Sequence, residues 1–301
     1  MRHAFTICLL LLTVVASMAQ AQEAGFSSYR EAMAKGATLY NSGKLAESRG
    51  PLEAAAKLAE SDSDKCRIHQ TLMVVYAEGS DFPKMYESAE FVVEHAPYPS
   101  MASLTCRSLL GTVQKKGQVE AARKRYEDRV RKNDKDRTAL YIMSNYHGLL
   151  DRDYAQQCKY FQGLIHLNKA EGIDFDFALA GQLAFAYRLS HQYVESAELF
   201  EKIAPMHKDE TAWDYKEAAG AWLKAGQKDK ALAAAKKAEE LGADARAERS
   251  IDRWHADLGE VFLATGEGKL AVKHYEKAIE NAKADYYKKK FAEELEKAKK
   301  L

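Results

Sequence analysis

From Ser27 onward, apolar residues recur three and four positions apart, and glycines or polar turns interrupt them every 15 to 20 residues. This spacing predicts amphipathic α-helices of ordinary length that are arranged in pairs. Sustained alternation of apolar and polar residues is almost missing, and no Asn-Gly dipeptide marks a hairpin. The pattern therefore predicts an all-α chain.

The helix pairs repeat along the chain. One equivalent apolar position in the first helix of each pair is given by Leu39, Tyr76, Val113, Tyr146, Tyr187, Trp222 and Phe262. The intervals between these positions are 37, 37, 33, 41, 35 and 40 residues. A single helix pair cannot bury its own apolar face, so neighbouring pairs have to stack and share a core.

The clearest unit combines small residues where two helices would cross, large residues that fill the space between repeats, and a glycine at the turn: Leu258, Gly259, Phe262, Gly266, Ala271, Tyr275 and Ala278. This unit resembles the tetratricopeptide repeat, a helix–turn–helix of about 34 residues. The resemblance covers residues 28 to 283. It implies a right-handed superhelix, or α-solenoid, of about seven such repeats.

Three places depart from the repeat. Gly50-Pro51 falls inside the second helix of the first pair, so that helix is expected to kink or to start late. The fourth pair has Leu150-Asp151-Arg152-Asp153 in place of a glycine turn, which makes its register the hardest to fix. Residues 168–176 form the longest irregular join, where a change of curvature between four repeats and three is expected.

The two ends of the chain differ from the array. Residues 1–21 combine a short positive start, an apolar run and Ala19-Gln20-Ala21, which predicts a secretory signal peptide cleaved after Ala21. The apolar run is too short to cross a bilayer, so a periplasmic or secreted protein is expected. The repeat array then occupies residues 22–283, and residues 284–301 form an amphipathic helix suited to capping it.

Charge and cysteine content narrow the function. The chain has 45 basic and 44 acidic residues, and removal of the leader leaves 44 of each. A neutral chain has no net field to attract nucleic acid, so no nucleic-acid partner is expected. Outside the leader, Cys66, Cys106 and Cys158 form an odd set, for which buried thiols or one Cys66–Cys106 disulfide are the alternatives.

Motifs for chemistry are missing from the sequence. It contains no His-Glu-x-x-His, no Gly-x-Ser-x-Gly and no phosphate-binding glycine loop, and its nine histidines are scattered. Asp174-Phe175-Asp176 lacks the glycine and the later glutamate of a calcium loop. We therefore expect a protein that is not an enzyme and that has no metal and no cofactor.

The resemblance implies that the first helix of each pair lines a concave face. After the core positions are set aside, that face contains Arg30, Tyr40, Asn41, Arg67, Gln70, Glu78, Arg107, Gln114, Lys115, Arg137, His147, Phe185, Arg188, Trp213, Lys216, Lys224, Arg253 and Glu260. Nine of these are cations and two are acids. Cations with interspersed aromatic side chains suit a carboxylate-rich ligand.

These observations predict an exported scaffold that binds a partner protein or peptide, acidic ones included, in its concave groove. The alternative is a binding protein for a small anionic ligand in the same groove. The family's carboxylate clamp needs Lys and Asn on the first helix, where this chain has Met33 and Ala37, so such a clamp is not expected. The sequence determines neither the partner nor the oligomeric state.

Overall fold

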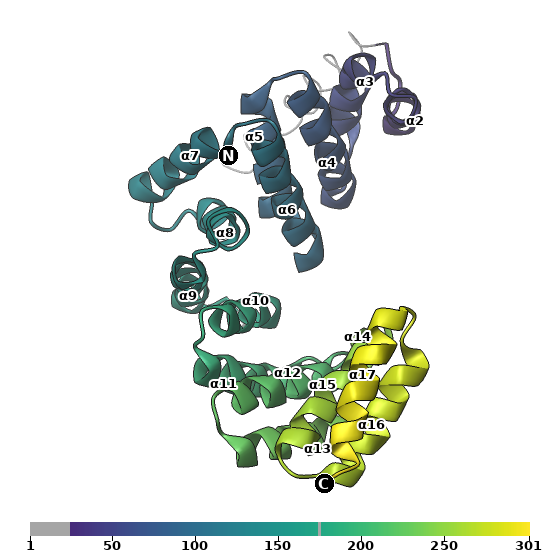
Figure 1. Ribbon diagram of the computed structural model, residues 1–301. Helices are drawn as coiled ribbons and strands as arrows, with labels where there is room; N and C mark the ends of the chain where they lie inside the picture. Colours follow the sequence, from purple (N-terminus) through teal and green to yellow (C-terminus); the bar gives the residue numbers. More distant parts are fainter. Residues whose placement is uncertain (1–24, 174–175) are drawn as a thin grey trace, which may run out of the picture. The chain divides into compact units, whose positions relative to one another are not determined.

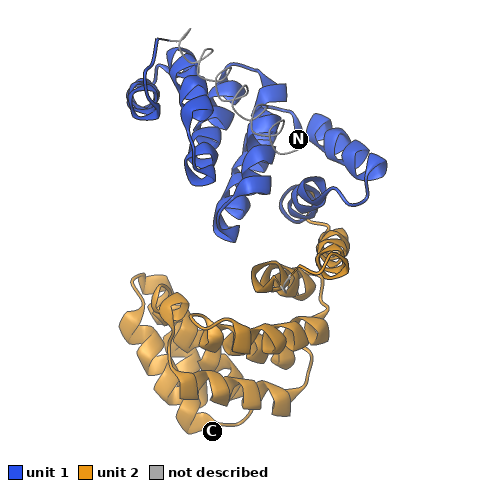
Figure 2. Ribbon diagram, turned by 180° about the vertical axis from the view of Figure 1, so that it is seen from behind, with its two compact units in different colours: residues 1–150 blue, residues 151–301 orange. Residues whose placement is uncertain are grey.

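A computed structural model describes residues 25–173 and 176–301, and within these residues all regular structure is helical (Figure 1). The chain divides into two compact units, Met1–Leu150 and Asp151–Leu301 (Figure 2). The predicted signal peptide, residues 1–21, lies outside the described residues, as do residues 174 and 175 of the predicted join. The change of curvature near residues 168–176 stays a prediction.

The first unit contains three complete helix pairs and the first helix of the fourth: α2 (Tyr29–Asn41), α3 (Leu45–Leu58), α4 (Asp62–Glu78), α5 (Phe82–His95), α6 (Pro99–Lys115), α7 (Val119–Lys132) and α8 (Arg137–Tyr146). Most helices pack against their neighbours in sequence. α7 packs more on α8 than on α6, and its polar sequence buries only Ala122 and Tyr126. Glu90 of α5 holds it in place by accepting from Arg125 at 2.8 and 3.2 Å and pairing with Arg129 at 2.7 Å.

The second unit begins with α9 (Tyr154–Ala170) and adds three helix pairs, the short α14 and a final helix: α10 (Phe177–Leu189), α11 (Tyr193–Ile203), α12 (Thr211–Lys224), α13 (Lys228–Leu241), α14 (Ala245–Glu248), α15 (Ile251–Ala264), α16 (Gly268–Asn281) and α17 (Asp285–Ala298). One continuous core contains Phe200, Trp222, Trp254 and Phe262. α17 packs on α16 and buries one apolar stripe. The predicted all-α, TPR-like solenoid of consecutive helix pairs with a final helix is confirmed.

The turn between the two helices of a pair explains why one apolar position per repeat locates the repeat in the sequence. In six pairs the carbonyl of the equivalent apolar residue accepts a hydrogen bond from the backbone N–H five positions later, at 2.7 to 3.0 Å. The accepting residues are Leu39, Tyr76, Val113, Tyr187, Trp222 and Phe262. The residue before that donor has a positive φ, which is 84° at Gly266. This is the Schellman ending of a helix. The same apolar residue therefore fills the core and closes its helix.

Three pairs make this left-handed turn without glycine. Ser80, Arg152 and His191 adopt φ values of 58°, 56° and 62°. In the fourth pair, α8 first continues into a π-helical turn, His147–Asp151, and Arg152 then reverses the chain. A search for glycine could not have found this turn, because the fold enforces a conformation that side chains ordinarily avoid.

α3 begins at Leu45 and continues through Pro51, so the expected late start is wrong, and a kink at Pro51 stays a prediction. Cys66, Cys106 and Cys158 are free and buried, so the Cys66–Cys106 disulfide is wrong and the buried-thiol alternative is correct. Burial raises the pKa of the Cys106 thiol, which keeps it unreactive.

A matched pair of glycine variants tests the close packing of the first pair. A Cβ at Gly36 would lie 2.8 Å from two side-chain carbons of Leu52 and 3.3 Å from its backbone nitrogen, whereas a Cβ at Gly111 of α6 meets nothing within 4 Å. Gly36→Ala should lower the free energy of unfolding by about 1–3 kcal/mol through overpacking. Gly111→Ala should raise it by about 0.5–1 kcal/mol through helix propensity. Urea unfolding followed by circular dichroism measures both, and equal effects would refute the close crossing.

Candidate functional site

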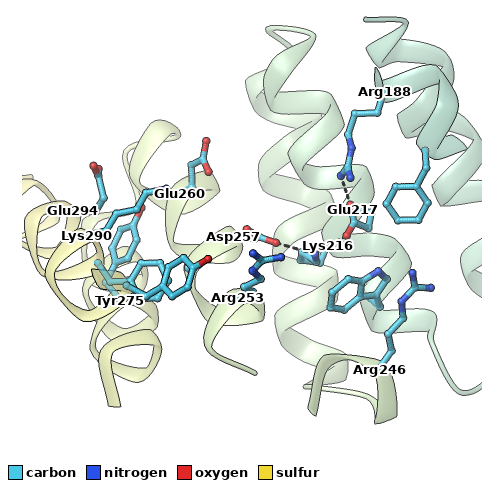
Figure 3. Close-up of a pocket in the computed structure, with 15 residues that line it drawn as sticks. Arg188, Lys216, Glu217, Arg246, Arg253, Asp257, Glu260, Tyr275, Lys290 and Glu294 are labelled. Atoms are coloured by element: carbon cyan, nitrogen blue, oxygen red, sulfur yellow. Dashed lines mark hydrogen bonds and ion pairs between the residues drawn. The ribbon is translucent and has the colours of Figure 1, made fainter. Parts of the chain in front are cut away.

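A cavity of about 810 Å³ lies in the second unit (Figure 3). Its walls come from α10, α12, α14, α15, α16 and α17. The lining consists of Phe185, Arg188, Trp213, Lys216, Glu217, Arg246, Arg253, Ala256, Asp257, Glu260, Tyr275, Tyr287, Lys290, Phe291 and Glu294. It is therefore both aromatic and highly charged.

One end of the cavity combines two aromatic rings with three cations. The guanidinium carbons of Arg188 and Arg246 lie 4.8 and 5.8 Å from the Phe185 ring centroid. The Trp213 ring has Lys216 Nζ at 3.7 Å and the Arg246 guanidinium carbon at 4.9 Å. These distances fall in the range of cation–π attraction. We call these five residues the cation–aromatic end.

A buried ion network sets the positions of two of these cations. Lys216 Nζ donates to Glu217 Oε1 at 2.7 Å and to Asp257 Oδ2 at 2.9 Å, and Arg188 Nη1 donates to Glu217 Oε2. Lys216 and Glu217 are only 4% and 5% exposed. Burial alone would raise the pKa of Glu217, but Lys216 and Arg188 outweigh it and hold that pKa below its ordinary value. Glu217 is therefore ionised and joins α10 to α12.

The short helix α14 brings Arg246 to the same end. Asp244 caps this helix by accepting the backbone N–H groups of Arg246 at 3.1 Å and Ala247 at 2.9 Å, and it also accepts the backbone N–H of Trp213 at 2.8 Å. Arg246 Nη1 in turn donates to Glu210 Oε2 at 2.5 Å. Asp244 therefore ties the start of α14 to the first turn of α12, and Glu210 holds the Arg246 guanidinium.

The opposite end is built by α15, α16 and α17. Figure 3 shows Lys290 and Glu294 near Tyr275, apart from the cation–aromatic end. Glu260 also lines the smaller adjoining cavity, together with Arg188 and Lys216. Burial raises the pKa of Tyr275, and the nearby carboxylates of Glu294 and Glu260 raise it further. A hydrogen bond to Tyr287 raises the pKa of Arg253, which lies between the two ends.

The structure places the predicted concave residues in different surroundings. Five of them line this cavity together with Glu260: Phe185, Arg188, Trp213, Lys216 and Arg253. Lys224 lines a smaller adjoining cavity of about 160 Å³. In the first unit, Arg30, Asn41, Arg67, Arg107, Gln114 and Lys115 are exposed, and Tyr40, Gln70, Arg137 and His147 are partly buried.

The predicted residues of the first unit do not line the cavity of the second. Gln70 instead donates to Thr105 at 2.7 Å and so links α4 to α6, and Glu78 pairs with Lys116 at 2.9 Å. A binding role for the first-unit residues stays a prediction.

Sequence reasoning missed most of the other lining residues. Arg246 was missed because a four-residue helix has no periodicity, and the α17 residues were assigned only to capping. The signal available was the spacing of Tyr287, Lys290 and Glu294, which places them on one helix face. With Glu217 and Asp257 included, five basic and four acidic side chains line the cavity, so its cation excess is much smaller than the sequence projection suggested.

The described residues contain no cluster of three or more His, Cys, Asp or Glu side chains that could hold a metal ion. Among the same residues, no helix combines the length and apolar character needed to cross a membrane.

A histidine pair lies outside the cavity, between α15 and α16. The Nδ1 atoms of His255 and His274 are 3.1 Å apart, and His274 Nε2 lies 3.3 Å from Glu239 Oε1 of α13. Burial lowers the pKa of His255 to about 4, with help from His274, Lys277 and Lys273. Burial also lowers the pKa of His274, against the opposing effect of Glu239. Both histidines are therefore neutral in the folded protein near pH 7.

This pair predicts acid destabilisation. His255 binds a proton near pH 6.5 in the unfolded chain but only near pH 4 in the folded protein. The free energy of unfolding should therefore decrease as the pH falls from 6.5 to 4, whereas above pH 6.5 the contribution of neutral His255 is fully present. His255→Gln should reduce that loss by roughly 1–2 kcal/mol, after allowance for partial exposure. Burial raises the pKa of Asp214 to about 6, which acts in the opposite direction, so the measurement is the difference between wild type and variant. A difference independent of pH would contradict the assignment.

No protein-family model matches the chain, and no curated protein matches it. Solved structures do resemble it. A tetratricopeptide repeat protein from Parabacteroides merdae is 17% identical, with a TM-score of 0.44, covering 91% of this chain and 100% of its own.

Two other solved structures are similar in the same way. A STAND signal-transduction ATPase with a tetratricopeptide repeat sensor, from Pyrococcus horikoshii, is 17% identical with a TM-score of 0.42, covering 87% of this chain and 44% of its own. A kinesin-light-chain-like repeat protein from Podospora anserina is 15% identical with a TM-score of 0.32, and the match covers 73% of this chain and 95% of the other.

Proposed function

We propose that this chain is a scaffold that binds a peptide segment of a partner protein, and that the cavity of the second unit is its main binding site. The observation that supports this most directly is the convergence of aromatic and charged side chains from six helices on one cavity of about 810 Å³. Aromatic and arginine side chains dominate the binding energy of protein interfaces. Buried ion pairs hold several of these side chains in place before any ligand arrives.

A small ligand is the second candidate, because the cavity volume falls in the range of about 300–1,000 Å³ that small molecules occupy. An anionic ligand fits less well than the sequence alone suggested. The lining includes four carboxylates, from Glu217, Asp257, Glu260 and Glu294, and each would repel it.

We further propose that the scaffold acts in the periplasm or outside the cell. The support is the leader pattern of residues 1–21, which ends in Ala19-Gln20-Ala21. Mass spectrometry of the protein recovered from its own cells tests this, with a mature chain that begins at Gln22 expected. A chain that still contains residues 2–21 would contradict export by this route.

Selection from a displayed library of random 12-residue peptides tests the binding function. Peptides enriched on the mature chain should bind the Arg253→Glu, Lys290→Glu double variant at least about tenfold more weakly, because both cations line the cavity. Arg107→Glu with Lys115→Glu, two exposed cations of the first unit, provides the matched control. Arg188 is avoided, since a glutamate there would face Glu217.

Two outcomes would contradict this proposal. Enriched peptides that bind the cavity double variant as tightly as wild type would place the site elsewhere. If no peptide is enriched while a small anionic compound raises the unfolding temperature, the second candidate would be correct.

A further inference from the structure

The main cavity and the smaller adjoining cavity form one groove along α12 and α15. They share five lining residues: Arg188, Lys216, Glu217, Asp257 and Glu260. The main cavity reaches Trp213 in the first turn of α12, and the smaller one reaches Lys224 at the end of the same helix. The groove therefore follows α12 for about 16 Å, which is the length of about five extended peptide residues.

The charges in the middle of this groove neutralise one another. Glu217 accepts from Lys216 Nζ at 2.7 Å and from Arg188 Nη1, and Asp257 accepts from Lys216 Nζ at 2.9 Å. Two cations and two carboxylates form this network, so its formal charges cancel. A charged ligand side chain therefore gains little net attraction at this point.

The same network still offers both donors and acceptors to a ligand. Arg188 uses one of its five N–H groups for Glu217, and its side chain is 30% exposed. The Asp257 side chain is 50% exposed, and it pairs with Lys216 through Oδ2. Lys224 and Glu260, both exposed, add a donor and an acceptor beside the smaller cavity. A peptide main chain is the complementary partner, because it is neutral and each residue carries one N–H donor and one C=O acceptor.

Gly220 leaves room for that main chain to approach α12. A Cβ at this position would meet nothing within 4 Å, although Gly220 is partly buried and lines the smaller cavity. Three other helical glycines have the same open space but are exposed: Gly50, Gly111 and Gly163. Packing does not require glycine at position 220, whereas close approach of a ligand backbone is one arrangement that glycine permits.

We infer that the ligand is an extended peptide segment whose main chain lies along this groove, from the cation–aromatic end across the Glu217 network to Gly220. This rests on the proposed peptide-binding function and specifies what the site recognises. The central network hydrogen-bonds peptide groups of the ligand and does not select charged side chains. A small molecule confined to the main cavity would not reach Gly220.

An ester scan of a bound peptide tests the main-chain contacts on the unmodified protein. The probe is a 12-residue library peptide that binds the mature chain and is weakened by Arg253→Glu with Lys290→Glu. Replacing one amide at a time by an ester removes an N–H donor without adding bulk. At least one internal ester should weaken binding at least about tenfold, because it leaves an acceptor in the groove without its donor. Raising the salt concentration about tenfold should change the affinity less than about threefold, because the central charges are already paired.

Gly220→Leu tests the smaller cavity with the same peptide. The leucine side chain would occupy the space over α12 and should weaken binding at least about tenfold through steric exclusion. The variant should be at least as resistant to urea as wild type, because leucine favours a helix more than glycine does. Gly163→Leu, at an exposed position of α9 with the same open space, is the matched control and should bind like wild type.

Failure of this inference differs from failure of the proposed function. Cavity-dependent peptides that bind Gly220→Leu as tightly as wild type, that tolerate every internal ester, or that lose affinity steeply with salt would overturn main-chain recognition and leave peptide binding in place. If Gly220→Leu folds poorly, the ester scan on wild type still gives the answer. Absence of any peptide that depends on the cavity would overturn both.

Discussion

Replacement of Glu217 by alanine is expected to lower the free energy of unfolding of the second unit by about 3 kcal/mol or more. The change leaves the buried Lys216 ammonium and the Arg188 guanidinium without the carboxylate that joins them. Glu217→Gln keeps the volume and one acceptor, so its effect should be smaller. Tryptophan fluorescence during urea unfolding measures this unit alone, because Trp213, Trp222 and Trp254 all lie in it.

The pH dependence of Glu217→Gln adds a check on the cause. The folded pKa of Glu217 lies below the ordinary value of 4.5, so its ionic contribution is present above pH 4.5 and is lost as the pH falls through the folded pKa. The difference between wild type and Glu217→Gln should therefore be constant near neutral pH and shrink in acid. A difference that persists unchanged at low pH would show that charge is not the reason.

Trp222→Ala is expected to lower the free energy of unfolding by about 3–5 kcal/mol. Trp222 is 2% exposed in the core of the second unit, and its Nε1–H donates to Glu201 at 3.1 Å. Its removal leaves a large void and an acceptor without its donor. Circular dichroism during urea unfolding measures this loss. Fluorescence is unsuitable here, because the substitution removes one of the three tryptophans that give the signal.

Trp213→Ala is the matched comparison, since Trp213 is only partly buried and lines the cavity. It should lower the free energy of unfolding by only about 1 kcal/mol and weaken peptide binding at least about tenfold. If Trp213→Ala left binding unchanged, or if Trp222→Ala cost no more stability than Trp213→Ala, the division between core and site would be wrong.

The fold follows from sequence because one residue type performs two tasks at each repeat. Tyr76 and Trp222, for example, are large apolar residues at a fixed interval, and each also accepts the hydrogen bond that ends its helix. Spacing therefore determines both the helix pairs and their turns. Arg152 shows the limit, since its left-handed conformation is imposed by the surrounding fold and leaves no signal in the residue itself.

The candidate site could be predicted only in part. Arg188 and Lys216 were found because they lie on first helices, but their partner Glu217 was not. Adjacent residues on a helix do not ordinarily face each other, and only the long lysine side chain allows Lys216 to reach Glu217. Tyr287 lies in residues 284–301, for which the sequence predicts only a capping helix, because sequence alone does not show that this helix also forms a wall of the cavity.

Site-specific photo-cross-linking at Tyr287 tests the central claim most directly. Tyr287 lines the cavity, whereas the adjacent Tyr286 is 72% exposed and does not, so the two positions form a matched pair. With p-benzoylphenylalanine at either position, in the cells from which the protein comes, a partner protein should be cross-linked at position 287 and not at 286. Cross-linking at position 286 alone, equal cross-linking at both positions, or none at 287 would contradict the assignment of the cavity as the partner-binding site.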